Sequence, residues 1–187
     1  MKCNLLWVDL EMTGLSPEKD RILDDIVDLE LEKIEQILQK VGSDPEGEDV
    51  KLREKNLWKK IARKSGMGRR TGVGITAEGD MLAALGLRYG TKEATDFSIS
   101  VHRTLALAAY GSSVQMAKER GAFEVYDAKR EEQNPFVLRL KEESPELYDE
   151  MVKYGRRNIA CLTIAPTGTT CMNSYSTRRI SLIRTTT

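Results

Sequence analysis

Several residue types are scarce in this sequence of 187 residues. It contains one histidine and three cysteines, and aromatic residues make up 6% of the chain. The cysteines Cys3, Cys161 and Cys171 form no Cys-x-x-Cys pair and leave one thiol unpaired, which favours a reducing compartment over a disulfide framework. Acidic and basic residues balance at 29 each, so no net charge attracts nucleic acid or a membrane.

Long apolar runs are missing as well. No stretch is long enough to span a bilayer, and no apolar core of a secretory signal follows the N-terminal Met-Lys-Cys-Asn. We therefore predict a cytoplasmic protein that has neither a membrane nor a nucleic acid as partner. The length suffices for one domain with a hydrophobic core.

Helical periodicity is the main pattern that is present. Apolar residues between Ile26 and Val41 recur at helical spacing, and Gly42 ends that pattern. Roughly six helices are predicted in all, the clearest others being residues 48–64, 77–85, 92–120 and 145–154. Thr91 and Ser144 are the predicted N-caps of the last two, because their hydroxyls can accept from free backbone N–H groups.

A buried strand followed by a turn is predicted near the C-terminus. Ile159–Ala165 is apolar and rich in branched residues, and Pro166 ends it because proline cannot donate to a sheet ladder. Gly168 allows a close backbone approach, and Thr169 and Thr170 add hydroxyls. Free N–H groups at such a turn suit a phosphate, although an ordinary strand–turn–helix joint has the same pattern.

This stretch, from Arg156 to Thr170, resembles the phosphate-binding loop of the ribonucleotide reductase large subunit, closest to the adenosylcobalamin-dependent class. The resemblance covers about residues 23–170 in family order. Its other motifs lie at residues 24–32, 68–76, 79–90 and 118–123.

The resemblance implies a helix-rich α/β fold, a partial reductase barrel with few strands, chiefly Leu5–Asp9 and Ile159–Ala165. It implies a nucleotide substrate, adenosylcobalamin as cofactor and a phosphate site made of Pro166, Thr167, Gly168, Thr169 and Thr170. Because such a fragment cannot close a barrel, we expect exposed apolar patches that favour association.

Other family features are absent. The sequence has no Asn-x-Cys-x-Glu, which holds the radical cysteine of the family, and no reducing cysteine pair. We therefore assign no catalytic residue and expect no turnover from the chain alone. It could be a gene fragment, a fusion remnant or a docking subunit whose partner is the rest of a split reductase. The match fails from Cys171, and residues 171–187 are predicted to be a disordered tail.

A second resemblance lies within residues 1–22. Asn4–Leu15 is similar to the first motif of oligoribonuclease, a metal-dependent 3′-to-5′ exonuclease. Asp9 and Glu11 would leave one side of a strand together and could hold Mg²⁺ or Mn²⁺. The further aspartates and the histidine motif of that family are missing, and His102 fits the polar face of a helix. The alternative interpretation of the two carboxylates is a solvated strand end.

A dinucleotide-binding interpretation is rejected. Gly72–Ala77 fits Gly-x-Gly-x-x-Ala, but the preceding residues 65–70 do not form the strand which that motif requires.

Overall fold

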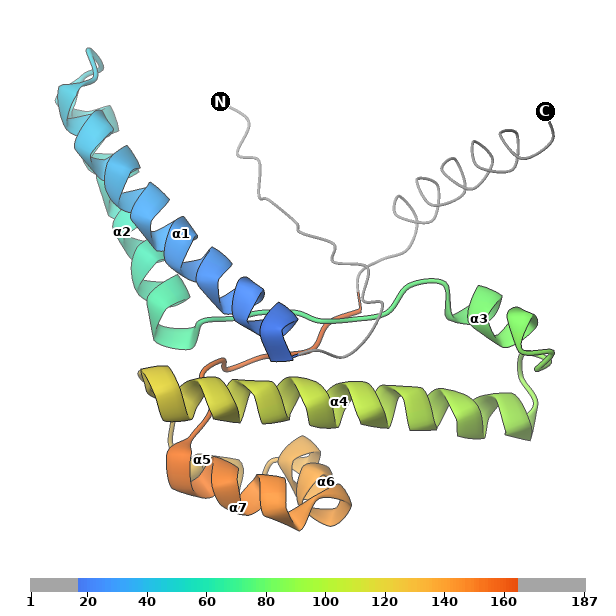
Figure 1. Ribbon diagram of the computed structural model, residues 1–187. Coiled ribbons are helices and arrows are strands. Elements are labelled where there is room, and N and C mark those ends of the chain that lie inside the picture. Colours follow the sequence, from blue (N-terminus) through green and yellow to red (C-terminus); the bar gives the residue numbers. More distant parts are fainter. Residues whose placement is uncertain (1–16, 165–187) are drawn as a thin grey trace, which may run out of the picture. The chain divides into compact units, whose positions relative to one another are not determined.

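The computed structural model describes residues 17–164, and helices dominate that range (Figure 1). Their order is α1 (Pro17–Ser43), α2 (Glu48–Gly68), α3 (Glu78–Ala84), α4 (Lys92–Arg120), α5 (Ala128–Glu131), α6 (Pro135–Glu143) and α7 (Pro145–Tyr154). The described residues fall into two compact units. One comprises residues 17–72 and 104–162, and the other comprises residues 73–103 and 163–164.

In the larger unit, α1 and α2 form a helical hairpin (Figure 1). The buried positions Val27, Ile34 and Val41 of α1 are seven residues apart, which places them on one stripe of the helix. This stripe packs on α2 and gives the hairpin its apolar seam. The predicted helix is confirmed, and Ile34 and Val41 of its predicted apolar stripe are buried. Leu29 of that stripe is 61% exposed, and α1 begins at Pro17, well before the stripe.

The hydrophobic core of the same unit lies between the C-terminal part of α4, α6 and α7. Its buried members are Ala109, Tyr110, Val114, Val137, Leu140, Met151 and Cys161. Tyr110 also stacks at a tilt on Phe136, with ring centroids 5.1 Å apart. Cys161 is buried in this core, and its Sγ donates to Asn158 O at 3.8 Å.

Helix boundaries follow the local sequence closely. Helix α4 begins after Thr91, whose Oγ1 accepts from Ala94 N at 3.3 Å, and α7 begins after Ser144, whose Oγ accepts from Leu147 N at 3.4 Å. Gly155 ends α7 with φ 73° and ψ −167°, a conformation that essentially only glycine adopts. The predictions for these two helices are confirmed. The short helices α5 and α6 were not predicted.

The predicted strand Ile159–Ala165 is wrong within the described residues, where no strand is formed. The chain after Asn158 is extended and lies beside the segment after α2. Ile159 N donates to Gly68 O at 2.9 Å, and Thr71 N donates to Ala160 O at 3.0 Å. A strand needs a longer ladder than these isolated bonds provide, and the apolar composition alone does not supply the missing neighbours.

The smaller unit contains α3 and the beginning of α4. Its two chain segments meet where Thr163 N donates to Val73 O at 3.0 Å. A Cβ on Gly74 would lie 1.9 Å from Thr163 O, so glycine is required there by the close approach of another backbone. This close approach explains the second glycine of the Gly-x-Gly-x-x-Ala pattern, Gly74, without a bound nucleotide.

Other predictions concern residues outside the described range. These are the strand Leu5–Asp9 and the tail 171–187. The three-part division at residues 22 and 170 stays a prediction, and its first boundary falls inside α1. Among the described helices, none is both long and apolar enough to cross a membrane. The cytoplasmic location stays a prediction.

Candidate functional site

The residues predicted to bind ligands also lie outside the described range. This holds for the phosphate loop Pro166–Thr170 and for Asp9 and Glu11. The structure does describe the segment that precedes this loop in the sequence. In that segment, the side chains of Arg156, Arg157 and Asn158 belong to two buried polar arrangements.

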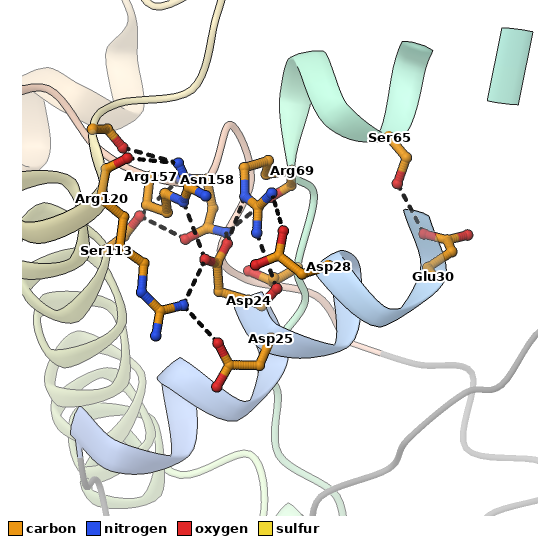
Figure 2. Close-up of polar contacts among 12 residues, drawn as sticks. Asp24, Asp25, Asp28, Glu30, Ser65, Arg69, Ser113, Arg120, Arg157 and Asn158 are labelled. Carbon is orange, nitrogen blue, oxygen red and sulfur yellow. Dashed lines mark hydrogen bonds and ion pairs between the residues drawn. The ribbon is translucent and has the colours of Figure 1, made fainter. Parts of the chain in front are cut away.

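The first arrangement is centred on Asp24 of α1, which is 0% exposed (Figure 2). Oδ1 accepts from Arg69 Nε at 2.8 Å and from Asn158 Nδ2 at 3.1 Å. Oδ2 accepts from Arg157 Nε at 3.1 Å and from Arg120 Nη1 at 3.4 Å. One carboxylate thus ties α1 to the end of α2, to the end of α4 and to residues 157–158. We call Asp24, Arg69, Ser113, Arg157 and Asn158 the Asp24 cluster.

Asn158, 1% exposed, is the second hub of this cluster. Its Nδ2 donates to Arg69 O at 3.0 Å as well as to Asp24. Its Oδ1 accepts from Ser113 Oγ at 2.9 Å, and the same hydroxyl accepts from Asn158 N at 3.0 Å. Both ends of the amide and the backbone N–H are therefore satisfied, which fixes this residue in one orientation.

Arg69 occupies an unusual backbone position. It follows the last residue of α2 with φ 45° and ψ 55°, the left-handed region in which glycine usually ends a helix. Its side chain explains why arginine stands there. Nη2 donates to Asp24 O at 3.1 Å and Nη1 to Asp28 Oδ1 at 2.7 Å, in addition to the Nε bond.

The rim of the cluster balances its charge. Asp28 binds Arg69 from the solvent side, and Asp25 accepts from Arg120 Nη1 at 2.6 Å. Arg157 Nη1 also donates to the carbonyls of Arg120 and Gly121 at 3.1 and 3.3 Å, so it covers the C-terminus of α4. Three carboxylates face three guanidinium groups, and no net charge is buried.

Ionisation of the cluster follows from these contacts. Burial alone would raise the pKa of Asp24, but the hydrogen bonds from Arg69 and Arg157 outweigh it, and the pKa lies below its ordinary value. Burial would likewise lower the pKa of Arg69, and its bonds to Asp24 and Asp28 raise it instead. Both groups are therefore charged at neutral pH.

The second arrangement surrounds Arg156, which is 4% exposed. Its guanidinium carbon lies 5.4 to 6.0 Å from the ring centroids of three aromatic residues. Nη1 binds the Glu131 carboxylate, and Nε donates to Asn158 O at 3.1 Å. Burial would lower the pKa of Arg156, but Glu131 raises it, and burial raises the pKa of Tyr110 to about 12. The Arg156 box consists of Arg156, Tyr110, Phe123, Tyr126 and Glu131.

These arrangements hold the chain rather than perform chemistry. In the described part of the protein, every buried side-chain nitrogen and oxygen has a hydrogen-bond partner, and no group of three or more His, Cys, Asp or Glu residues could hold a metal. Asp24 has four donors and a lowered pKa, so it is a poor base for proton transfer. Asp24, Arg69, Arg157 and Asn158 lie in the sequence motifs of the family resemblance, but no role was predicted for them.

The described residues do not fit adenosylcobalamin. A hollow of about 480 Å³ lies along the α1–α2 hairpin, a size that suits a drug-sized ligand, whereas a corrinoid is larger. Its charged lining side chains lie at the surface, and no buried polar group in the described range lacks a partner. The lining is Glu30, Lys60, Ile61, Lys64, Ser65 and Arg70.

The comparison with protein families decides the relationship. The family described as "Ribonucleotide reductase, barrel domain" matches residues 13–183, most of the chain. The chain belongs to this family. The family resemblance predicted from the sequence is therefore confirmed, and the match extends beyond both predicted ends, so the expected end of the match at Cys171 is wrong. The segments joined by the Asp24 cluster all lie within the matched residues.

Individual relatives agree. The vitamin B12-dependent ribonucleoside-diphosphate reductase of Mycobacterium tuberculosis is 31% identical over 112 residues, which are 60% of this chain and 13% of that protein. The ribonucleoside-diphosphate reductase subunit alpha of Chlamydia pneumoniae is 30% identical over 120 residues, 54% of this chain and 12% of that protein. The chain thus spans about an eighth of the length of these reductases.

The N-terminal resemblance is also confirmed as a local one. The oligoribonuclease of Alcanivorax borkumensis is 76% identical over 21 residues, which are 11% of this chain and 12% of that enzyme.

Proposed function

We propose that this chain supplies the substrate phosphate-binding part of an adenosylcobalamin-dependent ribonucleotide reductase, an oxidoreductase that converts ribonucleotides to deoxyribonucleotides. The family match over residues 13–183 carries the proposal, because it includes both Arg156–Asn158 and the loop Pro166–Thr170. The name of the M. tuberculosis relative supports the cofactor class. Because the described residues do not fit the cofactor, its site would lie elsewhere in the assembled enzyme.

The role proposed for the chain is binding without turnover. The sequence has no Asn-x-Cys-x-Glu, and the polar groups of the Asp24 cluster are occupied by one another. A partner containing the rest of the reductase would have to supply the radical cysteine. Deoxynucleotide formation by the purified chain with adenosylcobalamin and a dithiol would contradict this part of the proposal.

Binding is tested by titrating a nucleoside diphosphate into the full chain. Gly168→Val places a branched side chain where the loop is proposed to approach the phosphates, so affinity should fall at least about tenfold. Gly47→Val is a matched control, because Gly47 has φ −63° and a Cβ there meets nothing within 4 Å. Equal affinity in wild type and Gly168→Val would refute the loop assignment.

A second candidate function is metal-dependent cleavage of short RNA. It rests on the 21-residue identity with oligoribonuclease, and Asp9 and Glu11 would bind Mn²⁺. The test is release of mononucleotides from short RNA, compared between wild type, Asp9→Ala and the exposed control Asp149→Ala. We rank this function second, because the match covers 11% of the chain. Cleavage lost only in Asp9→Ala would reverse that order.

A further inference from the structure

The Asp24 cluster joins two stretches of chain that run beside each other. Residues 68–71 begin at the last residue of α2, and residues 157–160 precede the proposed phosphate loop in the sequence. Asp24 contacts both stretches, through Arg69 on one side and through Arg157 and Asn158 on the other. Asn158 then links them directly by its bond to Arg69 O at 3.0 Å.

The backbone bonds that follow depend on this alignment. Directly beyond the cluster, Ile159 N reaches Gly68 O at 2.9 Å and Thr71 N reaches Ala160 O at 3.0 Å. The Thr71 hydroxyl donates to the same carbonyl at 3.2 Å. A Cβ on Gly68 would come 3.2 Å from Ile159 Cγ2, so Gly68 lies closely against the Ile159 side chain. Shifting either stretch by one residue would break these bonds.

We infer that Asp24 is a positioning residue. Its carboxylate, acting through Arg157 and Asn158, fixes the register of residues 157–160 against residues 68–71, in the segment that precedes the proposed phosphate loop in the sequence. This inference rests on the proposed function for its consequence on nucleotide binding. Its local part, the register, does not.

The first variant is Asp24→Asn, with Asp28→Asn as its matched control. Both change a carboxylate that binds Arg69, but Asp28 is half exposed and reaches neither Arg157 nor Asn158. Asp24→Asn should speed amide exchange at Ile159 and Thr71 at least about tenfold more than at Val114 in the core. Asp28→Asn should leave that ratio unchanged.

Nucleotide affinity gives the second measurement. Asp24→Asn should weaken nucleoside diphosphate binding about tenfold, at a temperature where the variant remains folded. In a Gly168→Val background the same change should have no further effect, because both substitutions act on one loop. If Asp24 only stabilised the fold, Asp24→Asn would lower the melting temperature and would raise amide exchange at Val114 as much as at Ile159 and Thr71.

A milder variant covers the case in which Asp24→Asn does not fold. Ser113→Ala keeps every charge and removes the two bonds that orient Asn158, whereas Ser65→Ala removes a surface bond to Glu30. Ser113→Ala should raise exchange selectively at Ile159 and Thr71, and Ser65→Ala should not. If wild type binds no nucleotide, the proposed function fails, and the exchange data still decide the register. Uniform or unchanged exchange in Ser113→Ala and Asp24→Asn overturns the inference.

Discussion

Arg156 and Arg157 are neighbours in the sequence, yet the protein neutralises them in different ways. Arg157 joins a set of alternating charges in which Asp24 binds three arginines, and Asp25 and Asp28 each bind one of the other two. Arg156 has one carboxylate, Glu131, and otherwise meets the faces of three aromatic rings and backbone carbonyls.

This difference predicts how strongly a single substitution destabilises the surroundings of each buried arginine. Charges that neutralise one another depend on every member, because removal of one leaves several partners buried without compensation. Aromatic faces stabilise a cation without carrying a full charge, so the loss of one ring leaves the other contacts in place. The Asp24 cluster should therefore be more sensitive to a single substitution than the Arg156 box.

The largest effect is expected from Asp24→Asn. Arg69, Arg157 and Arg120 would all lose the charge that Asp24 now supplies, so the free energy of unfolding should fall by about 3–5 kcal/mol. Chemical denaturation of the full chain measures this change. Asp28→Asn, which alters the half-exposed partner of Arg69, should cost about 1 kcal/mol or less. Equal losses in both variants would show that burial of Asp24 is unimportant.

A smaller loss is expected when one ring of the Arg156 box is changed. Phe123→Leu keeps an apolar side chain but removes a face that lies 5.4 Å from the Arg156 guanidinium. The expected cost is about 1–2 kcal/mol, from packing and the lost cation–π contact. Denaturation under the same conditions gives the value. A loss as large as that of Asp24→Asn would remove the contrast between the two arginines.

Acid should remove the contribution of Asp24 to stability. The folded pKa of Asp24 is depressed below its ordinary value of 3.8. Its contribution to stability is therefore complete above that value and is lost as the pH falls below 3.8 through the lowered folded value. The difference in unfolding free energy between wild type and Asp24→Asn should consequently shrink in acid. A difference that stayed constant down to the pH of acid unfolding would contradict the lowered pKa.

The smallest effect is expected at the surface. Lys118 Nζ and Glu150 Oε1 are 2.7 Å apart, but the Glu150 side chain is half exposed. Glu150→Gln should change the free energy of unfolding by no more than about 0.5 kcal/mol. Thermal and chemical denaturation both test this. A cost above 1 kcal/mol would mean that distance, and not burial, governs the ion pairs of this protein.

The sequence predicted the features that depend on neighbouring residues. Helix α4 begins and ends at the predicted residues, because Thr91 caps its N-terminus and Gly121, with φ 85°, terminates it. The predicted strand Ile159–Ala165 is wrong within the described residues, because a strand depends on partners that the local sequence does not specify. Helices α5 and α6 are short and were not predicted, although Asp127 and Asn134 each cap a helix and could have indicated their starts.

The Asp24 cluster was not predicted, but the sequence carried a signal for it. Asp24 precedes Val27 by three residues and is ten residues before Ile34, so it is in phase with the buried stripe of α1. A charged residue at such a position needs buried partners of opposite charge. The motifs at Arg69 and at Arg157–Asn158 supply them, but only the fold shows that they meet.

One consequence of this cluster concerns protein synthesis. Asp24 is 133 residues from Arg157 and 134 residues from Asn158. Because the N-terminal part of a chain leaves the ribosome first, α1 is made long before these partners exist. Contacts of such high sequence separation form slowly. A chain truncated before residue 157 would hold Asp24 without Arg157 and Asn158, so premature termination should yield products that proteases remove quickly.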